Sequence, residues 1–389
     1  MDVGTGVLPS QSIKELLKHG CIHAHRAICE DQIQPASIDL RLGPKAYQVR
    51  ASFLPGKSST IITKAKSLLV SEVDLTVPDP APLAPLSVYI VPLLEGLALP
   101  NDVRGIANPK STTGRLDIFT RLITERVDEF ERVPIGYDGD LFVEVSSRTF
   151  PIRLKAGMRL NQLRFVRGDS RPEANGMLTR LLKESGMTYG PNGDDAGTVM
   201  TTVTVDLEGD DSSRIVAYKA KNNAPTIELN NINHYDAAEF WEPIYAPPNG
   251  RLILEPQSFY ILASKQKVKV PPAYAAEMVP YDPAMGEFRV HYAGFFDPGF
   301  GFGVDGEIGG TKAVLEVRAY EMPILLEDNQ LVGRLNYYRM ADVPDRVYGS
   351  AIGSSYQEQG LALSKQFKRP GTPVPHSPHR PASFAPVAQ

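Results

Sequence analysis

Short runs of hydrophobic and β-branched residues, interrupted every few positions by proline or glycine, dominate the chain. Typical runs are SVYIV at 87–91, LFVEV at 141–145 and AVLEV at 313–317. Apolar runs of this length between turn-forming residues are typical of β-strands. The pattern predicts a mostly β fold, built as a sandwich or barrel.

Helical signals are few. Residues 10–17, SQSIKELL, place a capping serine ahead of spaced apolar residues, and residues 180–184, RLLKE, predict one further short helix. Both helices are expected at the periphery of the β-structure.

The two halves of the chain resemble each other. Residues 141–165 match residues 313–337 without a gap at an offset of 172, which pairs Glu144 with Glu316. A second match farther upstream has an offset of 171. A nearly constant offset indicates an internal repeat, so we predict two tandem copies of one β-rich domain.

Chain length and turn signals give the expected boundaries. A chain of 389 residues exceeds the usual size of one domain, and turn formers concentrate between residues 168 and 198. We therefore predict a first domain over 1–175 and a second over 196–368. Residues 369–389 contain six prolines among small and polar residues and are expected to be disordered.

Charge and apolar patterning exclude several classes of partner. The net charge of −4 provides no general attraction to polyanions, so no nucleic-acid partner is expected. No apolar run reaches the length of a membrane span, and no signal peptide is recognisable. We expect a cytoplasmic protein with no membrane partner.

The sequence also argues against zinc chemistry. Cys21 and Cys29 are the only cysteines, and His23 and His25 beside them have no second ligand pair at finger spacing. The chain lacks a Walker phosphate loop, a GxSxG elbow and the HxE and PCxxC signature of zinc deaminases. A zinc-activated water is therefore disfavoured.

One segment has a composition suited to phosphate. Residues 108–115, NPKSTTGR, group the cations Lys110 and Arg115 with three hydroxyl side chains around a glycine. Cations and hydroxyls of this kind bind phosphate oxygens through charge-assisted and neutral hydrogen bonds.

Together with its neighbours, this segment resembles the dCTP deaminase family of the dUTPase-like superfamily. Residues 34–43, QPASIDLRLG, are nearly the strand-entry signature of that family, and 110–115 resembles its R-S-S-x-x-R motif with Lys110 and Thr112 as substitutions. Residues 126–128, RVD, fall where the family has R-I-D, and residues 136–144, GYDGDLFVE, resemble its G-W-x-G-x-I-x-L-E. Residues 129–135 form an insertion between these two motifs.

The resemblance implies two tandem dUTPase-like β-barrel or β-clip domains and hydrolytic deamination of dCTP to dUTP and ammonia, a step toward dTTP. It also implies a role for each matched residue. Glu144 falls on the catalytic glutamate as general base and acid, with Ser111 and Arg115 positioning the water. The implied substrate-binding residues are Lys110 and Thr112 at the phosphates, Arg126 and Asp128 at the sugar or pocket wall, and Phe142 and Val143 at the pyrimidine edge.

The second copy retains only part of the motif set. Residues 296–300, FDPGF, and Glu316 are kept, whereas residues 279–286, VPYDPAMG, contain no cation where the phosphate motif should lie. We expect a degenerate, structural site there. Tyr356 and Gln359, in a segment similar to the family's closing segment, are expected to cover the nucleotide of the first copy. If sites are assembled from mixed halves, Glu316 faces the 110–115 loop of another domain instead.

Cofactor and partners follow from the same resemblance. The expected substrate is dCTP, with Mg²⁺ bound through the triphosphate and with no zinc. dTTP is a candidate feedback inhibitor. The resemblance also implies a homo-oligomer of trimer type. Two alternatives stay open: a dUTPase-like or bifunctional diphosphohydrolase, and a non-catalytic nucleotide-binding regulator.

Overall fold

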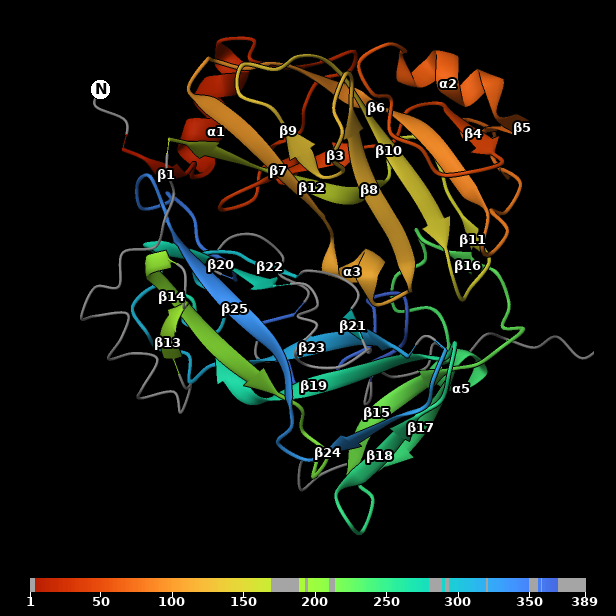
Figure 1. Cartoon of the computed structure of the whole chain (residues 1–389), viewed down its shortest axis with the longest axis vertical. Coiled ribbons are helices and arrows are strands. Elements are labelled where there is room, and N and C mark those ends of the chain that lie inside the picture. The colour runs from red at the N-terminus through yellow and green to blue at the C-terminus, as the bar shows by residue number, and fades with distance from the viewer. Residues whose placement is uncertain are drawn as a thin grey trace, which may run out of the picture.

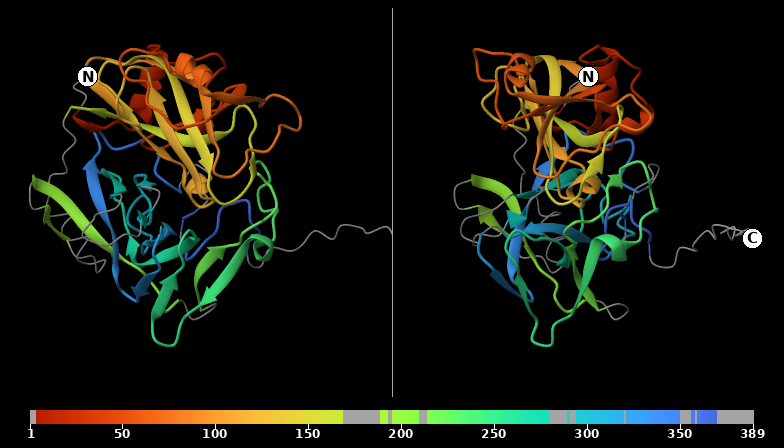
Figure 2. Two further views of the ribbon diagram at one scale, coloured as in Figure 1. Left: turned by 45° about the vertical axis from the view of Figure 1, so that its right-hand side comes forward. Right: turned by 90° about the vertical axis from the view of Figure 1, so that its right-hand side faces the viewer.

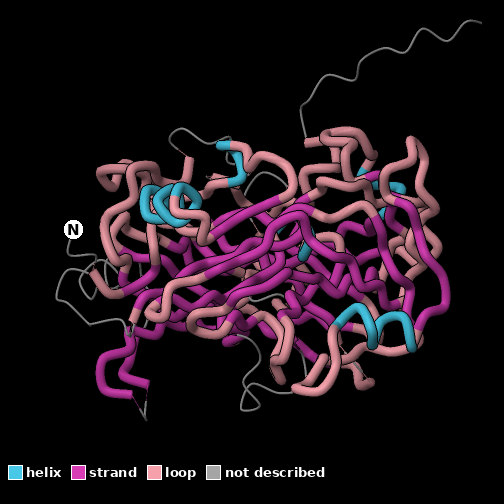
Figure 3. Tube along the Cα trace, turned by 90° about the horizontal axis from the view of Figure 1, so that it is seen from above, coloured by secondary structure: helices cyan, strands magenta, loops and turns pink. Residues whose placement is uncertain are grey.

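The computed structural model describes residues 4–168, 189–192, 195–209, 214–279, 289–290, 294–319, 321–349, 356–357 and 359–369. The helix predicted at 180–184 and nearly all of the tail predicted to be disordered lie outside these residues. Strands dominate the described chain, as Figure 3 shows, and its helices are few and short. The prediction of a mostly β fold is confirmed.

The first half contains two sheets and three short α-helices. Their bounds are β1 (Gly6–Val7), α1 (Ser10–Lys18), β2 (Ile22–Ala24), β3 (Ile38–Arg41), β4 (Lys45–Val49), α2 (Ile61–Ser67), β5 (Leu69–Asp74), β6 (Val88–Ala98), β7 (Val103–Pro109), α3 (Ser111–Gly114), β8 (Ile118–Thr124), β9 (Arg132–Val133), β10 (Asp138–Ser147), β11 (Ile152–Arg153) and β12 (Arg159–Arg167), with a 3₁₀ turn at Glu30–Gln32. One sheet has the order β5-β4-β6-β10-β8 with β2 on β6, and the other has the order β1-β12-β7-β9 with β3 on β12.

The second half repeats this arrangement. Its elements are β13 (Tyr189–Asn192), β14 (Asp195–Thr204), β15 (Ile215–Ala220), β16 (Ile227–Glu228), α5 (Ala237–Phe240), β17 (Trp241–Tyr245), β18 (Arg251–Leu254), β19 (Phe259–Val268), β20 (Tyr274–Val279), β21 (Arg289–Val290), β22 (Phe295–Phe296), β23 (Thr311–Arg318), β24 (Ile324–Glu327) and β25 (Leu331–Arg339). Its larger sheets have the orders β17-β15-β19-β23-β21 and β13-β14-β25-β20-β22. The strands β10 and β23, which carry Glu144 and Glu316, therefore hold the same position in corresponding sheets.

Helix α1 forms where the sequence predicts it, but Ser10 does not cap it. Ile13 and Leu16 are buried at a spacing of three, while Glu15 and Lys18 are exposed, which is the pattern of a helix lying on a core. Pro9 is the N-cap residue, and the Ser10 hydroxyl instead donates to Asp345 of the second half. The serine thus contributes to the contact between the halves.

The two halves share a continuous hydrophobic core. Figures 1 and 2 show them stacked on each other, with the first half above the second. The rings of Phe240 and Trp241 lie 5.8 and 5.4 Å from that of Phe150, centroid to centroid, and Phe367 packs on the same cluster. Strands β11 and β16 pair in parallel across the boundary. This extensive contact holds the facing surfaces of the halves in a defined arrangement.

No helix in the described ranges has the length and apolar character needed to cross a membrane.

Candidate active site

A cavity of about 350 Å³ lies where the two halves meet. Figure 1 shows α3, at the lower face of the first half, pointing toward the sheet that contains β23. Three parts of the chain line the cavity. The first half contributes Asp31, Gln34, Asp39, Lys110, Ser111, Thr112, Arg115 and Arg159, the second half contributes Phe295, Phe296, Asp297, Phe300, Val314, Glu316 and Tyr348, and the C-terminal segment contributes Tyr356, Gln359 and Lys365.

The loop after β7 carries the cations and hydroxyls predicted to bind phosphate. Backbone hydrogen bonds fix its start, because the amide of Lys110 donates to the Leu160 carbonyl at 2.8 Å. The Thr113 hydroxyl donates to the same carbonyl at 3.0 Å. Thr113 is therefore part of the loop's support, whereas Ser111 and Thr112 line the cavity.

Two carboxylates of the second half face this loop. Asp297 follows β22, Glu316 lies within β23, and both are buried at the cavity wall. Burial raises the pKa of Glu316 to about 7, and the nearby positive charge of Arg115 opposes that rise. Burial and the neighbouring charge of Asp39 raise the pKa of Asp297 to about 7. Both groups can therefore exchange protons near neutral pH.

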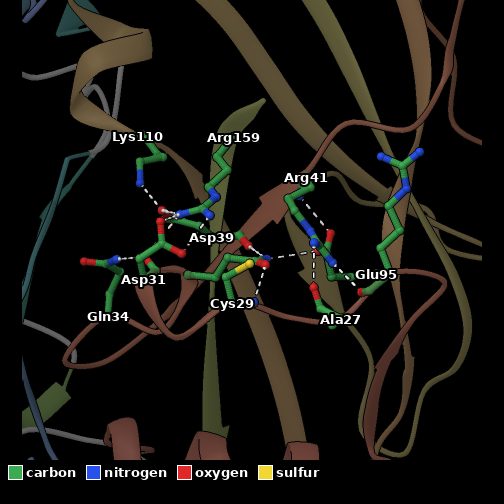
Figure 4. A network of polar contacts seen from close by, with 11 residues as sticks. Ala27, Cys29, Asp31, Gln34, Asp39, Arg41, Glu95, Lys110 and Arg159 are labelled. Atoms are coloured by element: carbon green, nitrogen blue, oxygen red, sulfur yellow. Dashed lines mark hydrogen bonds and ion pairs between the residues drawn. The ribbon is translucent and has the colours of Figure 1, made fainter. Parts of the chain in front are cut away.

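Two ion pairs hold cationic side chains of the first half at the opposite wall. Lys110 pairs with Asp39, and Arg159 donates to both carboxylate oxygens of Asp31 at 3.0 and 2.9 Å. Figure 4 shows Lys110 and Arg159 converging on these carboxylates. Lys365 lies on the same side, and burial together with the charge of Lys110 lowers its pKa. This wall offers three amine or guanidinium groups to an anionic ligand.

A buried network behind this wall keeps Asp39 in place. The carboxylate of Glu95 accepts from the backbone amide of Arg41 at 2.7 Å, from its guanidinium at 2.7 Å and from the amide of Gln32 at 3.0 Å. Gln32 also donates to the Asp39 carbonyl at 3.0 Å. These bonds fix the strand β3 on which Asp39 lies, and Figure 4 shows Arg41 and Glu95 of this network.

Aromatic side chains form the remaining wall, and a planar ring can stack on them. They are Phe295, Phe296, Phe300, Tyr348 and Tyr356. The Arg115 guanidinium lies 3.7 Å from the centroid of the Tyr356 ring, which is a cation–π contact at the edge of the cavity.

The C-terminal segment crosses from the second half onto the loop at residues 110–115. One guanidinium nitrogen of Arg115 donates to the Gln359 side-chain oxygen at 2.9 Å and to the Ala362 carbonyl at 3.0 Å. The hydroxyls of Thr112 and Tyr356 lie 3.1 Å apart, and the Ser364 hydroxyl donates to the Thr112 carbonyl at 2.8 Å. The structure thus brings Tyr356 and Gln359 beside Ser111, Arg115 and their neighbours.

Two family models match the halves of this chain. The description "2'-deoxycytidine 5'-triphosphate deaminase (DCD) N-terminal domain" matches residues 4–169, and the corresponding C-terminal domain matches residues 174–367. A crystal structure of 2'-deoxycytidine 5'-triphosphate deaminase from Agrobacterium tumefaciens is 45% identical, with a TM-score of 0.79 over 87% of this chain and 99% of that chain.

The chain belongs to the dCTP deaminase family. The resemblance seen in the sequence motifs is thereby confirmed. Two curated relatives, from Methanosphaera stadtmanae and Dictyoglomus thermophilum, carry the name "dCTP deaminase, dUMP-forming". They are 28% identical over 162 residues and 27% identical over 186 residues, covering 41% and 47% of this chain and 78% and 89% of the relatives.

Glu144 does not line the cavity. It is 2% exposed on β10, where Arg121, its cross-strand neighbour on β8, donates to one carboxylate oxygen at 3.1 and 2.5 Å. The Arg121 guanidinium is itself stacked 3.6 Å from the centre of the Phe130 ring. The carboxylate of the first copy is therefore paired within its own domain, while the corresponding carboxylate of the second copy faces the loop.

Four more residues that the motifs predict to bind substrate lie outside the cavity. Phe142 and Val143 are buried in hydrophobic clusters of the first half. Arg126 and Asp128 are exposed after β8, where Asp128 borders a separate hollow with Arg104 and Arg132. All four residues belong to the same copy of the repeat as Glu144. Like Glu144, they do not line the cavity.

Several cavity residues were not predicted as site residues of the first copy. For two of them the sequence held a signal, because Asp39 lies inside the strand-entry signature and Glu316 pairs with Glu144 in the repeat alignment. Asp31, Arg159, Phe295, Tyr348 and Lys365 had none. Their shared location depends on contacts between segments that are far apart in the chain.

No group of three or more His, Cys, Asp or Glu side chains suited to a metal ion occurs among the residues the structure describes.

Proposed function

We propose that this protein hydrolyses dCTP to dUTP and ammonia in the cavity between its halves. The observation that carries this proposal is Glu316, a buried carboxylate with a pKa near 7, beside the guanidinium of Arg115. A general base works best when its pKa lies near the working pH. Membership of the dCTP deaminase family supports the same reaction.

The substrate fits the chemistry of the three walls. The triphosphate is assigned to Lys110, Thr112, Arg159 and Lys365, because amines, guanidinium groups and hydroxyls match phosphate oxygens. The pyrimidine is assigned to the aromatic wall, where a planar base can stack. Asp39 and Asp297 each have a buried Oδ1 without a hydrogen-bond partner in the described chain, which suits them to accept from a sugar hydroxyl.

The proposed reaction needs one proton carrier. Glu316 takes a proton from water as the water oxygen bonds to C4 of the base, and it delivers that proton to the ring nitrogen N3. It then moves the hydroxyl proton to the amino group, the C4–N bond breaks, and ammonia leaves. Ser111 positions the water, while Arg115 favours the ionised form of Glu316 before attack.

Glu316 thus takes the role that the motif pattern assigns to Glu144. A site assembled from both halves explains why the second copy keeps its carboxylates but not its cations. The first copy supplies the loop that binds phosphate, and the second copy supplies the carboxylate that carries protons.

Mg²⁺ belongs to this proposal as part of the substrate, bound by the triphosphate oxygens. The zinc-free mechanism, the trimer-type assembly, the cytoplasmic location and dTTP as feedback inhibitor also stay predictions. Rigorous removal of zinc with Mg²⁺ retained tests the first of these, and we expect unchanged turnover.

A second candidate function is release of pyrophosphate to give dUMP, which the names of the curated relatives favour. Product analysis separates the candidates: dCTP is supplied with Mg²⁺, and nucleotides and ammonia are quantified over time. We expect dUTP and ammonia in equal amounts. A dUMP and pyrophosphate product supports the bifunctional enzyme, and binding without turnover supports the regulator. Arg115→Ala serves as the control that must lose whatever activity is measured.

A further inference from the structure

A buried ion pair joins the two segments that carry the loop and the carboxylate. Asp117 lies two residues after Arg115, and Arg318 lies two residues after Glu316. The Arg318 guanidinium donates to the Asp117 carboxylate and, at 2.8 Å, to the Thr149 hydroxyl. That hydroxyl donates to the same Asp117 oxygen at 2.6 Å. Asp117 is 0% exposed and Arg318 is 7% exposed, so water does not replace these bonds.

The Asp117 end of the pair is held rigidly to the loop. Its amide donates to the Gly114 carbonyl at 2.9 Å, and its own carbonyl accepts from the amide of Arg148 at 3.0 Å. Its φ of 55° lies in the left-handed region, which is unfavourable for most residues other than glycine. Aspartate enters this region more readily than most residues, and its buried carboxylate is held there by Arg318 and Thr149.

The Arg318 end is held equally firmly to the second half. Its other terminal nitrogen donates to the Gln257 carbonyl next to β19. Because side chains two apart on a strand point to the same face, Arg318 and Glu316 both project from β23 toward the first half. Movement of Arg318 therefore carries Glu316 with it.

We propose that the pair of Asp117 and Arg318 is a positioning clamp that sets the Glu316 carboxylate against Arg115 and Ser111. The clamp rests on the proposed deamination at this cavity. Neither residue lines the cavity, so both act through Glu316 and Arg115 rather than on the substrate. A buried ion pair adds little net stability, but its directional bonds can select one arrangement of two surfaces.

The experiment compares a neutral double variant with the native chain. Asp117→Asn tolerates the left-handed backbone, and Arg318→Met fills similar volume without charge. Together they leave no uncompensated buried charge, so the thermal melt should stay close to that of the native protein. We expect kcat for dCTP to fall roughly 10–100-fold, since small misplacement of reacting groups has effects of this size. KM should stay within about threefold, because the phosphate-binding side chains are unchanged.

Two further variants separate positioning from general loss of structure. Arg318→Lys keeps the charge but not the forked donor, and it should recover part of kcat. Lys14→Met removes an exposed contact of the same two halves, with Asp345 at 3.4 Å, and should leave kcat and KM unchanged. A double variant with a native melt and kcat within twofold of the native protein overturns the clamp. A rise in KM with unchanged kcat also overturns it.

A measurement without turnover keeps the clamp testable if the reaction is a different one. Infrared titration, with the Glu316→Gln spectrum subtracted, reports the ionisation of Glu316 directly. In the double variant the pKa of Glu316 should rise, because Arg115 no longer lies at its native distance. An unchanged titration overturns the clamp whether or not dCTP is turned over. Absence of dCTP turnover by the native chain counts against the proposed function alone.

Discussion

At the residue scale, the two equivalent glutamates differ in their partners and not in their burial. Glu316 and Glu144 hold corresponding places in the two copies, and both are almost fully buried. Glu144 has an arginine bonded to it within its own sheet, whereas burial raises the pKa of Glu316 to about 7 with Arg115 nearby. A carboxylate that titrates near neutrality is suited to carry protons, and Glu316 is the one of the two that lines the cavity.

Substitution of each glutamate separately tests this difference. Glu316→Gln should lower kcat for dCTP by ~10²–10⁴-fold, because it removes proton transfer but preserves shape. Glu144→Gln should leave kcat within a few fold of the native value, since Glu144 does not line the cavity. Steady-state rates of both variants under one set of conditions, with thermal melts as the folding control, decide between them. A large loss for Glu144→Gln alone would return the assignment to the first copy.

The raised pKa of Glu316 also predicts how stability depends on pH. An unfolded glutamate ionises near pH 4.5, while the folded one keeps its proton until about pH 7. The native state therefore binds more protons across this window, and stability falls as the pH rises through it. Above about pH 7 the buried Glu316 carboxylate is ionised, and its charge lowers the free energy of unfolding by its full amount.

Glu316→Gln removes that charge, so it should raise Tm at pH 8 and have little effect at pH 5. Thermal melts of the native and variant proteins at both pH values measure the difference. An equal change in Tm at pH 5 and pH 8 would show that Glu316 does not ionise between these pH values. A combined gain in stability and loss of activity is expected of a residue kept for function.

At the scale of elements, the C-terminal segment depends on an aromatic anchor. Residues 359–369 reach Arg115 and Thr112 through hydrogen bonds, and Phe367 fixes the end of the segment in the cluster of Phe240 and Trp241. Phe367 is 2% exposed. Packing in the shared core therefore controls how the segment lies against the loop.

Phe367→Ala should reduce the free energy of unfolding by ~3–5 kcal/mol and raise KM for dCTP, because the segment loses its anchor. Phe142→Ala is the matched control, since Phe142 is similarly buried in a cluster remote from the cavity. It should reduce stability by a comparable amount with KM unchanged. Chemical denaturation and steady-state kinetics measure the two effects, and equal changes in KM would contradict a specific role for the segment.

At the scale of the whole molecule, one chain supplies every wall of the cavity. The loop comes from the first half, Asp297 and Glu316 come from the second half, and both belong to the same polypeptide. A shared core and paired strands β11 and β16 hold these surfaces together. One chain therefore contains both the loop and the carboxylate that the proposed reaction uses.

Complementation between two inactive variants tests this arrangement. Arg115→Ala damages the loop and Glu316→Gln damages the carboxylate, so chains carrying one change each contain no intact cavity. Co-expression of the two should therefore give no more activity than either variant alone. Recovery of a substantial fraction of native activity would mean that loop and carboxylate come from different chains. Co-purification through two different affinity tags is the control that mixed assemblies have formed.

Local residue patterns were enough to predict the strands and the family. The apolar runs at 87–91, 141–145 and 313–317 overlap β6, β10 and β23, because a short apolar run between turn residues is a local signal of a buried strand. The motif around Lys110 to Arg115 identified the loop that lines the cavity, since the cations and hydroxyls that it needs are adjacent in sequence. Tyr356 and Gln359 could be predicted because their segment resembles the closing segment of the family.

Only the tertiary structure decided which carboxylate meets that loop. A strand's period of two tells which side chains share a face, but it does not tell which face of one domain packs on which face of another. Glu144 and Glu316 are equivalent within the repeat, and the packing of the halves places Glu316 opposite Arg115 and leaves Glu144 with Arg121. The raised pKa of Glu316 follows from that packing, because burial and charge act through space and not along the chain.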